Sequence, residues 1–240
     1  MKKLITLLMI SVMATICVNA RNYPSQRPAE SDRLFKSPAV EAKIAEVTKM
    51  LTNDRLAWMF ANCFPNTLDT TVHPNGELDT FVYTGDIHAM WLRDSGAQVW
   101  PYLQLINDDP QLKNMIAGVI LRQFKCITID PYANAFYKEE DKVGYWASDL
   151  TEMLPGVHER KWEIDSHCYP IRLAYEYWKT SGDDSIFSDL WLQAIELTLK
   201  TFRDQQRKEG VGPYTFMRKT TRAFDTLGNN GNGSPVNPVG

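Results

Sequence analysis

Apolar residues recur at helical spacing through most of the chain. After Ser37 and Pro38, which suit an N-cap and a first helical position, the pattern predicts a helix over residues 38–62 that is interrupted near Asn53. Further apolar stripes predict helices over residues 89–106, 110–128, 165–180 and 184–208. The fold class that this pattern indicates is all-α.

Two kinds of segment interrupt the helices. Residues 66–84 are Thr-rich and alternate around Pro74-Asn75-Gly76, which predicts a short hairpin or an extended loop. Residues 131–164 and 211–240 are long and rich in aromatic and charged residues. Loops of that length are uncommon in compact domains, so these segments are either functional or contain elements that the pattern does not reveal.

The first 20 residues have the order of a secretory signal peptide. Met1-Lys2-Lys3 is basic, Leu4 to Val18 is apolar, and Val18-Asn19-Ala20 is a small-residue ending. The apolar run is shorter than the roughly 20 residues that span a bilayer. We therefore expect cleavage after Ala20, export to the periplasm or out of a bacterial cell, and no membrane segment after cleavage. Residues 21–37 are expected to form a flexible approach to a folded domain that begins at residue 38 and continues to residue 240.

Composition narrows the classes of function. The chain carries 26 basic and 29 acidic residues, a net charge of −3, and no basic run, which argues against nucleic-acid binding. Apolar residues at 44% and charged residues at 23% are ordinary for a globular domain. Seven Trp leave room for a ligand that stacks on rings. The cysteines that would remain after leader removal, Cys63, Cys126 and Cys168, imply no disulfide framework.

The densest group of polar and aromatic side chains lies between Thr84 and Ser95, with the sequence TGDIHAMWLRDS. We expect a helix to begin near His88, with Asp86 at its cap and with Trp91 and Ser95 on the face of His88. Taken alone, the pattern also fits a structural arrangement of a capping Asp, a packed Trp and an Arg93–Asp94 pair.

A second group, Trp162 to Pro170, precedes the next helix and carries Glu163, Asp165 and His167 at alternate positions. Loops that lead into helices at one end of an antiparallel helical array are neighbours in space, so we expect both groups to line one cavity. Carboxylates, imidazole and Arg hold hydroxyl groups by directional hydrogen bonds, and Trp or Tyr faces pack on sugar rings. The combination indicates a polyhydroxylated ligand.

Other chemistries lack their motifs. The sequence contains no G-x-S-x-G, no Walker loop and no G-x-G-x-x-G. No recognised metal spacing such as H-E-x-x-H is present either, and we expect no metal and no cofactor. The side chains that would otherwise offer nitrogen and oxygen ligands to a metal are Asp86, His88, His158, Glu163, Asp165 and His167.

These segments resemble glycoside hydrolase family 125. The likeness rests on TGDIHAMWLRDSGAQ from Thr84, YWASDL from Tyr145, WEIDSHCYP from Trp162 and the Asn- and Gly-rich tail, and it runs from about residue 38 to the end of the sequence. The family consists of bacterial and fungal metal-independent exo-α-1,6-mannosidases with an (α/α)6 barrel and an inverting mechanism. The resemblance implies removal of terminal mannose from a mannose-containing oligosaccharide. The residues that it implies for the terminal-sugar subsite are Asp86, His88, Trp91, Arg93, Asp94, Trp162, Glu163, Asp165, His167 and Tyr169.

The same resemblance implies an incomplete barrel. A complete (α/α)6 barrel has twelve helices, which at about 11 to 12 residues each plus connections need far more residues than this chain has. The family's general acid is an Asp in an Arg-Pro-Ser-Asp-Asp type segment directly after the Asn-Gly-rich stretch, and its general base is a Glu much further on. The only Arg-Pro pair here is Arg27-Pro28. We therefore expect the N-terminal half of such an enzyme, inactive alone, with the acid/base pair beyond residue 240.

Three alternatives stay open. By spacing alone, Asp94 and Glu163 would be the acid/base pair. Another (α/α)6 hydrolase, glucoamylase-like or trehalase-like, would share the fold and the cavity chemistry but not the sugar. A non-catalytic sugar-binding protein would need the same pocket without an acid.

Overall fold

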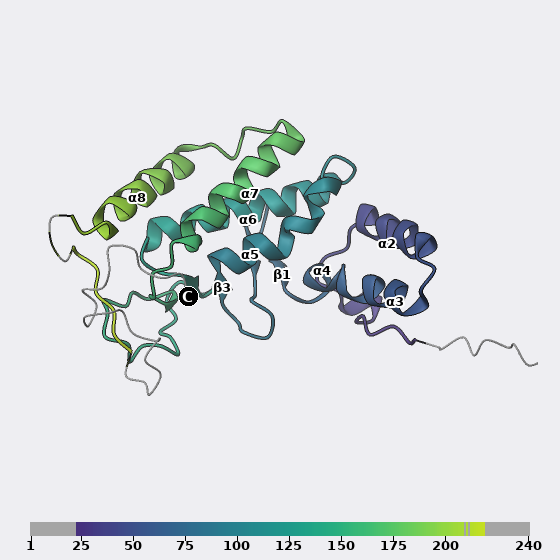
Figure 1. The fold of residues 1–240 in the computed structure, drawn as a ribbon, viewed down its shortest axis with the longest axis horizontal. Helices are drawn as coiled ribbons and strands as arrows, with labels where there is room; N and C mark the ends of the chain where they lie inside the picture. Colours follow the sequence, from purple (N-terminus) through teal and green to yellow (C-terminus); the bar gives the residue numbers. More distant parts are fainter. Residues whose placement is uncertain (1–22, 209, 211, 219–240) are drawn as a thin grey trace, which may run out of the picture.

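The computed structural model describes residues 23–208, 210 and 212–218, and within this range the chain is rich in helix (Figure 1). The expected signal peptide and the Asn- and Gly-rich tail lie outside the described residues. Within the described part, no helix has the length and apolarity to cross a bilayer. The elements in chain order are η1 (Glu30–Asp32), α2 (Pro38–Met50), α3 (Asp54–Cys63), α4 (Asn66–Thr70), β1 (Val72–Pro74), β2 (Thr80–Val82), β3 (Met90–Trp91), α5 (Leu92–Val99), η2 (Trp100–Leu105), α6 (Pro110–Ile129), β4 (Ala135–Phe136), β5 (Val157–Glu159), α7 (Asp165–Ser181) and α8 (Asp189–Gln205).

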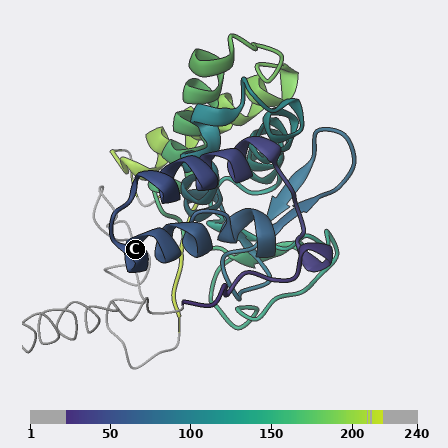
Figure 2. The same cartoon turned by 90° about the vertical axis from the view of Figure 1, so that its right-hand side faces the viewer.

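Helices α2 and α3 lie side by side at one end of the molecule (Figures 1 and 2). The Ser37 hydroxyl caps α2 by accepting a hydrogen bond from the Val40 amide at 3.2 Å. Asn53 Oδ1 caps α3 by accepting from the amides of Arg55 and Leu56 at 3.0 and 3.1 Å. The predicted interruption near Asn53 is therefore confirmed, because that side chain starts a new helix.

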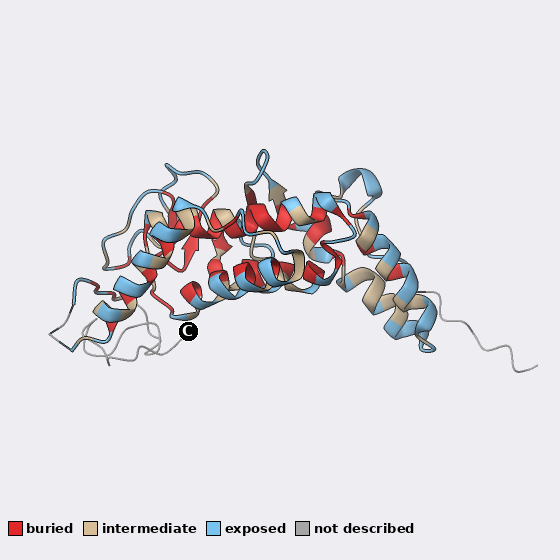
Figure 3. Cartoon of the chain, turned by 90° about the horizontal axis from the view of Figure 1, so that it is seen from above, coloured by how far each residue is buried: buried red, intermediate tan, exposed pale blue. Residues whose placement is uncertain are grey.

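Helix α6 is the centre of the larger part of the fold. It contacts α5, α7, α8 and β2. Figure 3 shows buried residues along the middle of an elongated molecule, between helices with exposed outer faces. The apolar stripe predicted for this helix is confirmed, because its members are at most 1% exposed: Leu112, Ile116, Val119, Ile120, Phe124 and Ile127.

The helices on either side of residue 182 differ in how well the pattern predicts them. Helix α7 ends, as expected, at Gly182, whose φ of +69° suits glycine. Helix α8 starts later than predicted, at Asp189. Asp183 Oδ1 accepts hydrogen bonds from the amide and the hydroxyl of Ser185, at 3.1 and 2.6 Å, and this turn delays the helix.

The predicted hairpin is confirmed as strands β1 and β2. They are antiparallel, with Val72 opposite Val82 and Pro74 opposite Thr80. Strand β2 packs on α6 at Gly118, where an added Cβ would lie only 2.6 Å from Thr80 Oγ1. The absence of a side chain at Gly118 therefore lets the hairpin approach the central helix.

The expectation of a helix from His88 is wrong. Met90 and Trp91 form strand β3, which pairs antiparallel with β4, and β4 pairs with β5. The amide of Trp91 donates to Thr84 Oγ1 at 3.2 Å, and that of Leu92 donates to the Asn134 carbonyl at 3.1 Å. Because these partners take the amides, α5 begins only at Leu92, and Asp86 is not its cap. A strand from a distant segment thus overrides the local helical pattern.

The described part of the expected flexible approach contacts the helical body. Arg27 Nε lies 2.7 Å from Asp69 Oδ2 of α4, and its Nη2 lies 2.6 Å from Glu41 Oε1 of α2. The segment is therefore attached at Arg27, and its flexibility stays a prediction.

Candidate functional site

Arg93, in the first turn of α5, joins the two sequence motifs. Its Nη1 lies 2.9 Å from Asp165 Oδ2 and 3.4 Å from Glu163 Oε2, and its Nη2 lies 3.4 Å from Asp94 Oδ2. We call these four residues the Arg93 cluster. Asp165 begins α7, and α7 packs along α5, so the side chains meet across 70 and 72 positions of sequence. The two motifs therefore meet at Arg93, as predicted. The expectation that both line one cavity is not met, because none of residues 162–169 is among those that line the cavity described next.

Three carboxyl groups share one guanidinium in this cluster. Burial raises the pKa of Glu163 to about 7, an effect that the charge of Arg93 opposes and the charges of Asp165 and Glu159 reinforce. Asp94 Oδ2 and Asp165 Oδ1 are buried and accept no hydrogen bond from the other described residues. The cluster therefore offers both donors and spare acceptor oxygens, which is what a ligand rich in hydroxyl groups needs.

A cavity of about 540 Å³ opens beside β3 and β5, the strands that lead toward α5 and α7. Aromatic side chains form much of its wall. Trp91 and Tyr137 both meet the His158 ring edge-on, at centroid distances of 5.0 and 4.8 Å. The lining residues are Asp86, Ile87, His88, Trp91, Tyr137, Lys142, Tyr145, Trp146, His158 and Glu159.

Glu159 connects this cavity to the Arg93 cluster. Its Oε2 accepts a hydrogen bond from Asn134 Nδ2 at 2.6 Å, and the Asn134 carbonyl accepts from the amide of Leu92, next to Arg93. Its Oε1 accepts from Arg218 Nη2 at 2.6 Å. The Glu159 carboxylate of the cavity wall is therefore linked through Asn134 to the backbone beside Arg93, and directly to Arg218.

Seven of the ten residues implied by the resemblance lie in the cavity wall or in the Arg93 cluster. Asp86, His88 and Trp91 line the cavity. Arg93, Asp94, Glu163 and Asp165 make up the Arg93 cluster.

Trp162 and His167 lie elsewhere, in the interior, and their contact with a ligand stays a prediction. They are 4% and 1% exposed, and Trp162 Nε1 donates to His167 Nδ1 at 3.4 Å. Burial lowers the pKa of His167 to about 4, so the imidazole is neutral near pH 7. Trp162 packs with Tyr132, Tyr214 and Phe216, and its amide donates to the Tyr214 hydroxyl at 2.8 Å. Both side chains pack in the interior of this structure.

Tyr169 also lies away from the cavity lining. It is on the face of α7 that meets α5, where its Cβ is 3.7 Å from the position of a Cβ added at Gly96. Arg172 lies 5.6 Å from its ring. Its placement suits helix packing.

The described residues contain no group of three or more His, Cys, Asp or Glu side chains arranged to hold a metal ion. The six side chains considered as ligands are distributed among the cavity, the Arg93 cluster and the interior, where His167 lies.

The sequence reasoning missed several residues of the cavity wall, and Arg218, which contacts the wall. Tyr137, Lys142 and Glu159 belong to the segment 131–164, and Arg218 follows α8. Neither segment has a helical period, and strands of two or three residues leave no alternation to detect. The available signal was the unusual length and the aromatic and charged composition of these segments.

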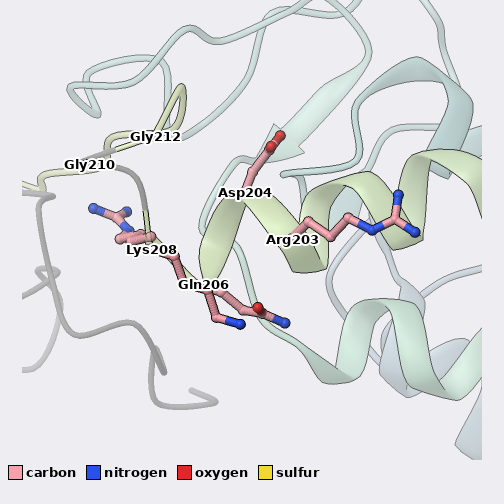
Figure 4. A pocket seen from close by; sticks show the side chains of 7 residues that line it. Arg203, Asp204, Gln206, Lys208, Gly210 and Gly212 are labelled. Atoms are coloured by element: carbon pink, nitrogen blue, oxygen red, sulfur yellow. The ribbon is translucent and has the colours of Figure 1, made fainter.

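A separate pocket of about 420 Å³ lies at the C-terminal end of α8 (Figure 4). Among its described lining residues there is neither an aromatic ring nor a member of the two motifs. It is therefore not the candidate site. The lining residues are Arg203, Asp204, Gln206, Arg207, Lys208, Gly210 and Gly212.

Carboxyl groups around a guanidinium, beside an aromatic cavity on a helical scaffold, have the composition of a site for a polyhydroxylated ligand. Comparison with known families agrees with that class. Residues 53–240 match the family described as metal-independent alpha-mannosidase (GH125), and the chain belongs to this family.

Two relatives show how much of the family's length is present. The chain is 38% identical over 233 residues to the meiotically up-regulated gene 157 protein of Schizosaccharomyces pombe, covering 89% of this chain and 46% of that protein. A solved metal-independent alpha mannosidase of Streptococcus pneumoniae, in a non-productive substrate complex with α-1,6-mannobiose, is similar with a TM-score of 0.78 and 40% identity. That match covers 83% of this chain and 47% of the solved chain. The chain therefore spans about half the length of these relatives.

Proposed function

We propose that this protein acts as an exo-α-mannosidase that removes terminal α-1,6-linked mannose with inversion, and that its helices form part of an (α/α)6 barrel. Membership of the GH125 family supports the reaction class. The observation that carries the proposal is the Arg93 cluster, in which Arg93 reaches Asp94, Glu163 and Asp165 next to an aromatic cavity. The α-1,6 linkage is supported by the mannobiose complex of the similar Streptococcus pneumoniae enzyme.

The residues of this chain bind and orient the sugar in this proposal. The Arg93 guanidinium donates to sugar oxygens, and the Asp94 and Asp165 oxygens accept from hydroxyl groups. Ring faces of the cavity wall, such as that of Trp91, pack on the apolar face of the sugar.

Inverting hydrolysis also needs one carboxylic acid and one carboxylate about 6.5 to 9.5 Å apart, on opposite sides of the bond that breaks. We assign Asp94 and Glu163 to binding because both pair with Arg93. In this proposal the acid/base pair belongs to the part of the family's length that residues 1–240 do not cover.

The test compares α-1,6-mannobiose with α-glucosides as substrates, each with and without EDTA. The proposal expects mannoside hydrolysis that survives EDTA, with β-mannose as the first product in NMR spectra. Preferred hydrolysis of α-glucosides, or loss of activity in EDTA, contradicts it. Binding of mannobiose without hydrolysis by the full-length protein indicates a sugar-binding protein instead.

The placement of the acid/base pair has its own test. Residues 21–240 expressed alone are expected to show no mannosidase activity, since general acid catalysis contributes about 10² to 10⁴-fold. Robust turnover by this piece, abolished by Asp94→Ala, would instead make Asp94 catalytic.

We also propose that the protein is exported, with the first 20 residues removed. Mass spectrometry of the periplasmic or secreted fraction should find a protein that begins at Arg21. An intact Met1 in that fraction contradicts cleavage.

A further inference from the structure

Arg218 makes an unusually complete set of contacts for a residue outside both motifs. Its Nε and Nη2 lie 2.8 and 2.6 Å from the two carboxylate oxygens of Asp149, and its Nη2 also lies 2.6 Å from Glu159 Oε1. Its guanidinium carbon is 3.4 Å from the centroid of the Trp146 ring. The side chain is only 9% exposed, so these contacts are little weakened by water.

The backbone around Arg218 is held in place independently of that side chain. Met217 pairs with Leu150, with amide-to-carbonyl distances of 2.8 and 3.2 Å. Tyr214 donates to the Arg160 carbonyl at 3.1 Å and accepts from the Trp162 amide at 2.8 Å. Replacing the Arg218 side chain should therefore leave the course of residues 214–217 intact.

The contacts of Arg218 reach the cavity at two points, because both Trp146 and Glu159 line it. The guanidinium covers one face of the Trp146 ring, and the Tyr145 ring lies perpendicular to it with the centroids 4.9 Å apart, at a place where Trp146 lines the cavity. By contrast, the neighbouring Tyr145 is 79% exposed, so burial does not hold its side chain in place.

We propose that Arg218 is a positioning residue of the sugar site, which holds the Trp146 ring and the Glu159 carboxylate in place as parts of its wall. The identity of the ligand rests on the proposed function, whereas the positioning of Trp146 does not. The planar fork of Arg is essential to this role, because it pairs with Asp149 through two parallel contacts while it stacks on the ring. A Lys ammonium keeps the charge but cannot do both.

The test compares Arg218→Lys with a matched control, Arg122→Lys, in the full-length protein. Arg122 also pairs with one carboxylate, that of Asp79, through Nε and Nη2, and its side chain is 5% exposed, but it does not line the cavity. The measurements are KM and kcat for α-1,6-mannobiose and the NMR signal of the Trp146 indole N–H. That signal is assigned with Trp146→Phe.

For Arg218→Lys we expect KM to rise about tenfold and kcat to change less than about threefold. The reason is that a displaced Trp146 ring weakens sugar binding equally in the ground state and in the transition state. The Trp146 indole signal should shift. Arg122→Lys should leave both readouts at the wild-type values, although it removes a comparable ion pair.

The proposal is overturned if Arg218→Lys keeps the wild-type KM and indole signal, or if both variants raise KM equally, which would indicate general destabilisation. If Arg218→Lys does not fold, Asp149→Asn takes its place. This variant keeps the guanidinium of Arg218 on the Trp146 ring but weakens its paired contacts with residue 149. A partial shift of the indole signal is therefore expected, and an unchanged signal contradicts the proposal. If the wild-type protein neither binds nor hydrolyses mannobiose, the proposed function fails, and the indole signal still decides the role of Arg218.

Discussion

Arg93 and Asp165 lie 72 residues apart in the sequence, yet Arg93 Nη1 and Asp165 Oδ2 are 2.9 Å apart. The contact joins the first turn of α5 to the first residue of α7. Because the two helices pack along each other, the pair is held by the apolar core and not by the ion pair alone. The geometry of the candidate site therefore depends on helix packing.

Replacing Arg93 by Ala should weaken both stability and sugar binding. The change leaves the Asp94, Glu163 and Asp165 carboxyl groups together without a cation, which we expect to lower the free energy of unfolding by about 1 to 3 kcal/mol. Urea unfolding and calorimetric titration with α-1,6-mannobiose measure the two effects. The control is Arg172→Ala on α7, whose guanidinium stacks on Trp100 at 3.7 Å. Equal loss of mannobiose binding in both variants would contradict a specific role for Arg93.

Glu163 should make the protein less stable as the pH rises. Its pKa is about 7 in the fold, above the ordinary 4.5, so between pH 4.5 and 7 the native state binds more protons than the unfolded state. The free energy of unfolding should then fall by up to about 3 kcal/mol across that window.

Glu163→Gln should remove this contribution. Urea unfolding of the wild type and the variant at several pH values between 4 and 8 gives the difference. A difference that stays constant with pH would show that the fold does not perturb the Glu163 carboxyl group.

His167 should act in the opposite direction. Its pKa of about 4 lies below the ordinary 6.5, so from pH 6.5 down to 4 the unfolded state binds a proton that the native state excludes. This group alone should therefore remove up to about 3 kcal/mol of stability as the pH falls through that window.

His167→Gln tests this effect and the interior placement together. The variant should lose stability at pH 7 through poorer packing, but its stability should depend less on pH below 6.5. Unchanged affinity for mannobiose is expected, since His167 is buried with Trp162. A large loss of affinity at unchanged stability would restore His167 as a ligand contact.

Gly118→Ala should destabilise the fold by about 1 to 3 kcal/mol despite the better helix propensity of Ala. Its Cβ would lie 2.6 Å from Thr80 Oγ1 and 3.1 Å from the amides of Asp79 and Thr80. The control is Gly96→Ala on α5, where the nearest atom is Gln123 Nε2 at 3.4 Å, an ordinary van der Waals distance. Chemical denaturation should show a loss for Gly118→Ala and little change for Gly96→Ala. Equal effects would contradict close packing of β2 on α6.

The sequence alone determined the features that follow from local chemistry. The stripe from Leu112 to Ile127 predicts α6, because burying one face of a helix requires an apolar residue every three or four positions. Asn53 predicts a helix start, because its side chain accepts hydrogen bonds from the amides of the first turn. Gly182 predicts a helix end, because glycine readily adopts the left-handed backbone conformation found there. The two motifs that meet at Arg93 were also readable, because the polar side chains lie at helix starts.

Only the tertiary structure decided which of those motif residues line the cavity. Trp162 and His167 are buried in the interior, whereas Trp91 lines the cavity from strand β3, which pairs with β4. Those strands are held by amide and carbonyl partners from segments about 20 to 45 residues away, and such pairing leaves no periodic trace in the local sequence. The same holds for Arg218, whose proposed role depends on Trp146 and Glu159, both far from it in the sequence.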